Sequence, residues 1–560
     1  MTKNSGNTAD YIIIGGGSAG CVLANRLSED PATKVTLIEA GPRDSNPWIR
    51  LPSGLIPLVN GTYCNWKYWS EPQRHLHNRR LYQPRGKVLG GCSSINAQVY
   101  VRGNAEDYNG WSQLGCEGWS YSEVLPYFLK MEDFQPDTSP ANSRYHNRGG
   151  PLTISNREFI NPLTEAFLKA AEQAGHARND DHNGACQEGI GILYSYNRDG
   201  QRCNNARAYL DPARPRANLQ IITNAQVHRL IISQGQVEGV EYSQNSHSQK
   251  LYCSEEVILS AGAFNSPQLL MISGIGPETE LKKHDIPLKL HLPGVGQNLQ
   301  DHLNLYVETR SKSRVGMSFH SSSWLRYTRE CLKYALFTKG ELTSNLLEAG
   351  GFIKCNPNQI TPDLQFHFLP SFGAHHGLDL SNLKKHYGYS LIFNDNRPHS
   401  RGSLTLQSSS ITDAPRIDPN YLSDERDVQQ LVQGVREARK ILAQPAFDDH
   451  RECEISPGDA LQSDEQLTEW VRNNAETVYH PACTCKMGVA TDPLAVVDSQ
   501  LRVWGIDKLR VADASIMPNL VSGNTNAACT MIGEKAAAMI LNQETAQPRK
   551  PEDAIPYATV

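Results

Sequence analysis

Residues 11–39 read YIIIGGGSAGCVLANRLSEDPATKVTLIE, and this stretch decides the fold. The apolar run at residues 11–15 ends in glycines, residues 18–27 have helical spacing, and residues 34–39 form a second apolar run. Short apolar runs bounded by glycine predict buried strands, and helical spacing between them predicts a helix. The stretch therefore predicts a strand–helix–strand unit.

The glycines of this unit form the pattern GxGxxG, with Gly15, Gly17 and Gly20 at the glycine positions. The first glycine allows a tight turn, the second lets backbone N–H groups approach a pyrophosphate, and the third permits close packing of helix and strand. Glu39 ends the second strand, where a carboxylate can accept both ribose hydroxyls and repel the additional phosphate of NADP. The pattern predicts a dinucleotide site and does not by itself separate FAD from NAD.

Size and composition limit the number of domains and the classes of partner that the chain can have. A chain of 560 residues exceeds what one hydrophobic core usually supports, so we expect two domains. The net charge of -5 leaves no basic excess for binding nucleic acid. Residues 1–10 lack the pattern of a signal peptide, and no apolar run reaches the roughly 18 residues of a membrane helix. We expect a cytoplasmic protein, and the sequence also leaves room for peripheral contact with a membrane.

The cysteines show no spacing that is typical of a metal or redox site. The chain has 13 cysteines, and the nearest pair, Cys483 and Cys485, fits neither a zinc ribbon nor a thioredoxin-like motif. We therefore expect free thiols in a reducing compartment and no bound metal.

Further patterns indicate that the dinucleotide-binding domain is discontinuous. Residues 256–261 and 509–512 are apolar runs of the same kind as the first strand. Residues 363–370 and 402–406 instead predict antiparallel strands of a different domain, and residues 427–442 predict an amphipathic helix. Segments from the start, the middle and the end of the chain would then build one domain, with the second domain inserted between them.

Four longer motifs follow one another along the chain. They are RGKVLGGCSSIN at residues 85–96, SAGAFNSPQLLMISGIGP at 260–277, YHPACTCKMG at 479–488 and SGNTNAACTMIGEK at 522–535. They resemble, in order, the signatures of the glucose–methanol–choline (GMC) oxidoreductases, a family of flavoenzymes. NLQDH at residues 298–302 and DASIMP at 513–518 fit as well. The similarity covers nearly the whole chain and is greatest to the branches that act on choline and on aliphatic alcohols.

The resemblance implies a fold of class α/β plus antiparallel β. A discontinuous Rossmann-like FAD-binding domain would carry an inserted substrate-binding domain, built on an antiparallel sheet flanked by helices. The FAD-binding domain is expected at residues 1–157, 200–306 and 478–545. The substrate-binding domain is expected at residues 158–199 and 307–477, and a C-terminal tail at 546–560.

The resemblance also implies which residues contact FAD. These are Gly15, Gly17, Ser18, Ala19, Gly20, Glu39, Ala40, Val88, Gly91, Asn96, Ala97, Val227, Ala261, Asp513, Ala514, Asn524 and Thr525. Members that attach FAD covalently carry a histidine where this chain has Ile95. Because isoleucine cannot form that bond, we expect noncovalent FAD.

The same resemblance places His480 and Asn526 at the reacting centre. A neutral imidazole can accept the hydroxyl proton near pH 7, while hydride passes from the same carbon to flavin N(5). Asn526 is expected opposite His480, where it would donate a hydrogen bond to the substrate oxygen. A helix predicted at residues 527–541 would direct its positive end at the reduced flavin. Cys483 and Cys529 stand beside these positions and are expected to be small packing residues.

The substrate is less well specified than the cofactor. We expect oxidation of a primary, aliphatic alcohol to its aldehyde, with choline dehydrogenase activity as the alternative and a non-redox lyase as a more distant one. A nicotinamide-dependent enzyme would leave the other motifs unused. Glu348, Trp66 and Tyr479 are the residues expected to contact the substrate. The electron acceptor is either quinone-like or oxygen, and the oligomeric state is not predicted.

Overall fold

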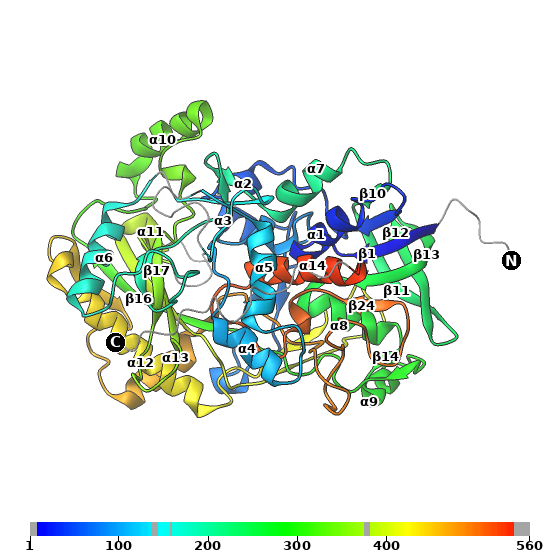
Figure 1. The fold of residues 1–560 in the computed structure, drawn as a ribbon. Helices are drawn as coiled ribbons and strands as arrows, with labels where there is room; N and C mark the ends of the chain where they lie inside the picture. Colours follow the sequence, from blue (N-terminus) through cyan, green and yellow to red (C-terminus); the bar gives the residue numbers. More distant parts are fainter. Residues whose placement is uncertain (1–7, 136–143, 157–158, 374–380, 543–560) are drawn as a thin grey trace.

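The computed structural model describes residues 8–135, 144–156, 159–373 and 381–542. Two large sheets lie at opposite ends of an elongated molecule, with the helix α14 (Asn526–Ile540) between them (Figure 1). Among the described residues, no helix is both long enough and apolar enough to cross a membrane.

The first sheet has a parallel part that contains the predicted strand–helix–strand unit. Its hydrogen-bonded order is β10, β2, β1, β13, β24, and all of these pairs are parallel. The strands are β10 (Leu219–Ile222), β2 (Val35–Ile38), β1 (Thr8–Ile14), β13 (His247–Leu259) and β24 (Leu509–Val511). Strands from the start, middle and end of the chain therefore meet in one sheet, as the apolar runs predicted.

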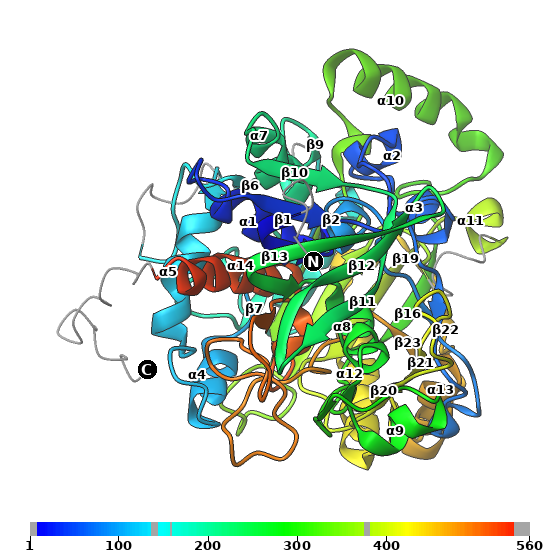
Figure 2. The same ribbon diagram turned by 90° about the vertical axis from the view of Figure 1, so that its right-hand side faces the viewer.

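The helix α1 (Ser18–Leu27) connects β1 to β2 and packs against α14. Figures 1 and 2 both show the two helices side by side. The first half of β13 continues into an antiparallel meander with β12 (Gln236–Gln244) and β11 (Ala225–Ser233). The ends of β1 and β13 and the start of α14 thus come together at one edge of the sheet.

The second sheet is antiparallel throughout. Its order is β17, β18, β19, β16, β22, and β23 also pairs with β16. The strands are β17 (Ala349–Ile353), β18 (Leu364–Leu369), β19 (Gly388–Asp395), β16 (Leu303–Ser311), β22 (Arg451–Ser456) and β23 (Glu476–Thr477). One face packs on the helices α6 (Pro162–Gln173), α12 (Glu425–Leu442) and α13 (Asp464–Asn474), forming a second hydrophobic core.

Alternation along these strands separates core residues from site residues. Phe366 and Phe368 of β18 lie in the second core, whereas His367 and Leu369 between and beyond them line a cavity. Successive side chains of a strand point to opposite faces, so one strand serves both purposes. The second sheet therefore presents one face to its helices and the other to the cavity.

Two details differ from the sequence expectations. Residues 402–406 contain β20 (Ser403–Thr405), which pairs with β21 (Arg416–Asp418) in a small separate sheet, and Leu404 belongs to the core of the first sheet. Because β16 begins at Leu303, a boundary between residues 306 and 307 would divide a strand of the second sheet. The expected boundary at 157/158 and the expected tail at 546–560 lie outside the described residues.

Candidate active site

One cavity is lined by residues from the glycine fingerprint to the second sheet. Its lining comes from residues 14–19, the segment 84–99, β11, the segment 260–265, the segment 477–481 and the start of α14. On the far side it is closed by side chains of β16, β18 and β19. Both halves of the molecule therefore contribute to one site.

The fingerprint forms a cradle that only glycine permits. Gly15 has a φ of +99°, and a Cβ placed there would lie 2.5 Å from the carbonyl oxygen of Ser260. A Cβ at Gly20 would lie 1.9 Å from the carbonyl oxygen of Gly15. The chain can thus turn tightly into α1, whose first N–H groups lie at the cavity and suit a pyrophosphate.

Glu39 lies at the position expected for a ribose partner. Its carboxylate lines the cavity and accepts hydrogen bonds from the backbone N–H groups of Gly16 and Gly41, both at 2.8 Å. Burial raises the pKa of Glu39 to about 7. Each carboxylate oxygen has a further lone pair, so Glu39 can also accept hydroxyl groups of a bound nucleotide.

Most of the residues expected at FAD line this cavity. They are Gly15, Gly17, Ser18, Ala19, Glu39, Ala40, Gly91, Asn96, Ala97, Val227, Ala261, Asp513, Ala514, Asn524 and Thr525. Gly20 and Val88 do not. Gly20 packs directly against the carbonyl group of Gly15 in the turn. The Val88 side chain is fully buried in a small apolar cluster with Ile49, Leu58, Cys64 and Ile95.

Asp513 lines the cavity, but its carboxylate accepts hydrogen bonds from neighbouring backbone N–H groups and serine hydroxyls. One oxygen accepts from the N–H of Gly262 and the hydroxyl of Ser266, and the other accepts from the N–H and hydroxyl of Ser515. Asp513 thereby fixes the start of α8 (Gly262–Ile272) against the segment before α14. It is a positioning residue for the cradle.

His480 lies at the junction of the cavity's two halves. Its backbone N–H donates to Asp301 at 2.8 Å, and its ring is almost wholly buried. Burial, and then the nearby His302, His367 and Arg85, lower the pKa of His480 well below its usual value of 6.5. At neutral pH the imidazole is therefore uncharged.

The hydrogen bonds around His480 define its tautomer. Nε2 of His302 lies 3.1 Å from the carbonyl oxygen of Asn396, which can only accept, so this nitrogen carries the proton. Burial lowers the pKa of His302 to about 4, so its Nδ1 is an unprotonated acceptor. The Nδ1 of His480 lies 3.0 Å from it and must donate. The Nε2 of His480 is left with a lone pair that points toward Asn524.

The amide that faces the His480 ring belongs to Asn524, whereas Asn526 was expected opposite His480 as a donor to the substrate oxygen. Nδ2 of Asn524 lies 3.4 Å from Nε2 of His480, and its Oδ1 accepts from Gln365 at 3.1 Å, which orients the amide. Asn526 lines the cavity too, but its Oδ1 accepts from Ser18 at 2.7 Å, where it ties α14 to α1. The two asparagines thus have different contacts, and both line the cavity.

Three further residues near His480 had no expected role: His302, His367 and Arg85. His367 and Arg85 line the cavity, and Arg85 donates to the carbonyl oxygen of Tyr479 at 2.7 Å. The only signal for His302 was its place in NLQDH, where Asp301 and His302 hold the backbone and the ring of His480 respectively. No sequence pattern marked His367, because it is one of several alternating positions in β18.

The part of the cavity beyond His480 has a largely apolar lining. Of the three residues expected to contact the substrate, Trp66 and Tyr479 line the cavity. Glu348 does not: its buried carboxylate accepts from the N–H of Asn161 and the hydroxyls of Thr164 and Ser344, at the start of α6. The apolar lining on the side of the second sheet comes from Met317, Phe319, Leu346, Leu347, Leu369, Phe372 and Ile392.

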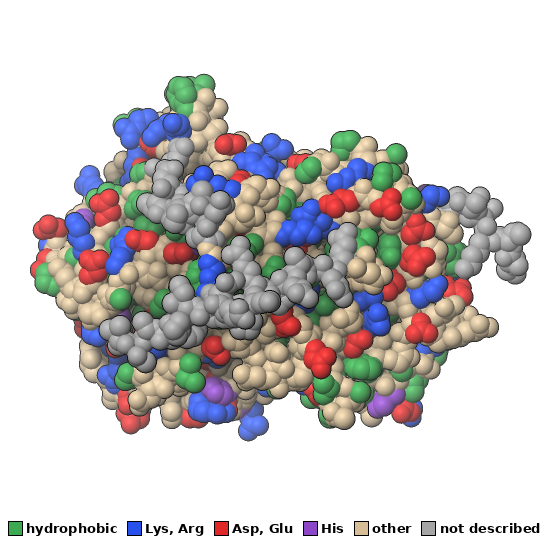
Figure 3. All heavy atoms as spheres, viewed as in Figure 1, with side chains coloured by type: hydrophobic (Ala, Val, Ile, Leu, Met, Phe, Trp, Pro, Cys, Tyr) green, Lys and Arg blue, Asp and Glu red, His purple; other side chains and the backbone are tan. Residues whose placement is uncertain are grey.

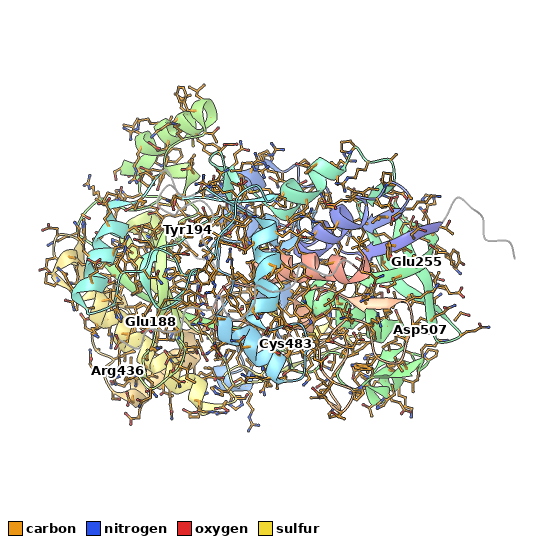
Figure 4. The ribbon with its side chains drawn as sticks, viewed as in Figure 1. Glu188, Tyr194, Glu255, Arg436, Cys483 and Asp507 are labelled. Carbon is orange, nitrogen blue, oxygen red and sulfur yellow. The ribbon has the colours of Figure 1, made fainter. Side chains whose placement is uncertain are left out.

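The two cysteines beside the motifs have different surroundings. Cys529 lines the cavity, whereas Cys483 is fully buried and donates its backbone N–H to the carbonyl oxygen of Ala514. Figure 4 shows Cys483 between the two halves of the molecule. Burial raises the pKa of both thiols far above the usual value, so both are protonated at neutral pH.

Fold and cavity together show a glycine-fingerprint domain that suits a dinucleotide, joined to a second sheet, with the uncharged imidazole of His480 at their junction. The GMC oxidoreductase family profiles match residues 9–304 and 398–533. The chain is 46% identical over 536 residues to the alcohol dehydrogenase [acceptor] of Pseudomonas putida, covering 95% of this chain and 96% of that protein. It is 46% identical over 541 residues to the mitochondrial choline dehydrogenase of Homo sapiens, with coverage of 95% and 90%.

Among solved structures, formate oxidase of Aspergillus oryzae RIB40, described with a modification of its FAD, superposes with a TM-score of 0.89 at 28% identity. The match covers 97% of this chain and 99% of that one. The chain belongs to the GMC oxidoreductases. The predictions of family, fold class and FAD are confirmed. The comparisons support FAD-dependent oxidation of a small-molecule alcohol, with transfer of the electrons to an acceptor.

Proposed function

We propose that the protein oxidises apolar primary alcohols to aldehydes, with His480 as the base. The observation that carries this proposal is the unprotonated Nε2 of His480, which faces the cavity beside the donor Nδ2 of Asn524. An alcohol oxygen placed between these groups can give its proton to His480 while it accepts a hydrogen bond from Asn524. FAD bound in this cavity would supply the acceptor for the hydride that leaves the alcohol carbon.

The chain's own residues prepare this proton transfer. Asp301 holds the backbone of His480, and His302 keeps the proton of the ring on Nδ1, so that Nε2 is ready to accept. After the transfer, the lone pair of His302 still accepts from the charged imidazolium, which offsets part of the cost of a buried cation. The start of α14 lines the cavity and directs its N–H groups there, where they favour negative charge.

The lining of the cavity favours an apolar alcohol over choline. Among the described residues that line it, the only carboxylates are Glu39 and Asp513, and both lie with the fingerprint and the backbone cradle. A trimethylammonium group is held by negative charge and aromatic faces. Trp66 and Tyr479 supply rings, but Glu348 is engaged at the start of α6. An aliphatic chain needs only the apolar lining.

The electron acceptor in this proposal is quinone-like, which fits the description of the P. putida relative as an acceptor-linked enzyme. Oxygen is the alternative. Reduction of a soluble quinone that exceeds oxygen uptake at least tenfold would support the quinone, and the reverse ratio would assign oxygen.

The decisive experiment is anaerobic titration of the yellow holoenzyme with 1-hexanol and with choline. We expect 1-hexanol to bleach the flavin absorbance and choline to leave it unchanged at the same concentration. Bleaching by choline alone would assign the protein to the choline-oxidising branch. Bleaching by neither compound would contradict both substrate classes.

A further inference from the structure

The helix α10 (Trp324–Phe337) projects from the body of the molecule beside the second sheet (Figures 1 and 2). A surface helix normally places its apolar residues against the protein and its polar residues in water. In α10 the arrangement is reversed. Leu325, Leu332 and Leu336 share one side at helical spacing and are 87%, 60% and 64% exposed.

The inward side of α10 is polar, and it is this side that anchors the helix. Arg326 forms an ion pair with Glu341 at 2.8 Å and donates to the carbonyl oxygen of Gly316 at 3.0 Å. Glu330 is buried and accepts from the backbone N–H of Glu341 at 3.0 Å. The outward leucines therefore contribute nothing to holding the helix in place, and their exposure has no explanation within the described part of the chain.

Aromatic and cationic side chains accompany the exposed leucines. Trp324 and Phe337 are exposed at the two ends of the helix. Arg329, Lys333 and Lys339 lie exposed along the same stretch, and none of the exposed side chains of α10 is acidic. Figure 3 shows hydrophobic side chains at the outer end of this projection, with Lys and Arg side chains next to them.

We propose that the outward face of α10 docks on a lipid bilayer that contains anionic headgroups. A helix that exposes Leu on one side, Trp and Phe at its two ends and Lys and Arg beside the Leu side can lie in the interface of a bilayer, with its apolar side among the acyl chains. Anionic headgroups match the cations that flank this face. A symmetric dimer through the same face would instead bring the cations of both copies together, which costs free energy.

The position of α10 connects this docking to the cavity. Tyr327 on the inner side of α10 lines the cavity, and so does Phe319, which is 45% exposed just before the helix. Phe319 also donates its backbone N–H to the carbonyl oxygen of Leu383 in α11 (Ser381–Lys385), whose Lys384 and Lys385 are exposed. The cavity therefore reaches the surface at the base of α10. This consequence rests on the proposed function: a docked enzyme would receive apolar alcohols from the bilayer.

Vesicle flotation tests the docking without any need for turnover. We expect the holoenzyme to float with vesicles of phosphatidylcholine and phosphatidylglycerol, and to bind at least tenfold less when Leu325, Leu332 and Leu336 are all replaced by serine. The matched control is Leu288→Ser with Ile360→Ser, two residues that are exposed elsewhere. It should float like the parent protein. Unchanged oxidation of 1-hexanol would show that the triple variant is folded.

A charge variant tests the choice of lipid. Arg329→Gln with Lys333→Gln should lose the preference for phosphatidylglycerol, and added salt should weaken binding of the parent protein. Failure of the parent protein to float, or equal loss in the control variant, would overturn the proposal. A concentration-dependent dimer that the triple variant abolishes, without vesicle binding, would instead assign the face to a second copy of the chain.

The exposed thiols provide a second measurement. Cys331 lies on α10 and Cys186 lies elsewhere, and both are exposed. An environment-sensitive fluorophore on Cys331, in a Cys186→Ser protein, should shift to the blue when anionic vesicles are added. The same fluorophore on Cys186, in a Cys331→Ser protein, should not shift. A shift at Cys186 alone would place the contact on another surface.

Discussion

The rings of His302 and His480 meet through their Nδ1 atoms, 3.0 Å apart, with the ring planes almost perpendicular at 87°. Only one of two facing nitrogens can carry the proton, and the bond from His302 to Asn396 assigns it to His480. The Nε2 of His480 is thus kept unprotonated by a residue that does not itself line the cavity.

Replacement of His480 by alanine should leave the fold and the flavin content intact and lower kcat by about 10²–10⁴-fold, because the proton acceptor is lost. Steady-state kinetics with 1-hexanol, alongside the flavin-to-protein absorbance ratio, measures both effects. Activity within a few-fold of the parent enzyme would refute His480 as the base.

Replacement of His302 by phenylalanine should lower kcat by roughly 10-fold or more, with KM changed much less, because the Nδ1–H of His480 loses its acceptor while the substrate pocket is unaltered. His302→Asn places an amide oxygen near the position of Nδ1 and should recover part of the loss. A purely structural role predicts lost flavin and lower yield in both variants, without a selective fall in kcat.

The pH dependence of kcat/KM follows from the lowered pKa of His480. The base must be unprotonated, and a pKa well below 6.5 means that it is protonated only in acid. We therefore expect kcat/KM to be independent of pH around neutrality and to fall only as the pH drops below 6.5. An acid limb centred above pH 7 would contradict this assignment.

Substitutions of Asn524 and Asn526 should have different effects, the first on kcat and the second on flavin retention. Asn524→Asp preserves size but removes the donor that faces His480, so kcat should fall by about 10-fold or more while flavin is retained. Asn526→Ala breaks the link to Ser18 and should mainly weaken flavin retention and the contact between α1 and α14. Equal losses of kcat in both variants, with normal flavin content, would show that the division of roles is incorrect.

Attachment of the flavin can be tested by denaturation. Ile95 lines the cavity where covalent members carry histidine, and its side chain offers no nucleophile. Acid precipitation should therefore leave all FAD in the supernatant. Yellow colour that stays with the washed pellet would indicate a covalent bond at another residue.

Local patterns predicted a large part of this molecule. The helix expected at residues 18–27 is α1, and the one expected at 427–442 lies within α12. These elements follow from spacing and from glycine positions, which act over a few residues. Residues 402–406 were predicted as a strand correctly but placed in the wrong domain, since a strand's own pattern does not identify its partner.

The sequence by itself predicted a dinucleotide site, because glycines and a strand end are properties of short segments. The resemblance of its longer motifs to the GMC family implied FAD and made His480 the candidate base. Tertiary structure decided which groups face His480. Asn524 and Asn526 are two positions apart where α14 begins, so their side chains point in different directions, and only packing selects the one that meets the imidazole. The tertiary structure also places Glu348 at the start of α6, outside the cavity, and the leucines of α10 on the surface. Contacts of this kind between distant segments depend on how the two sheets assemble.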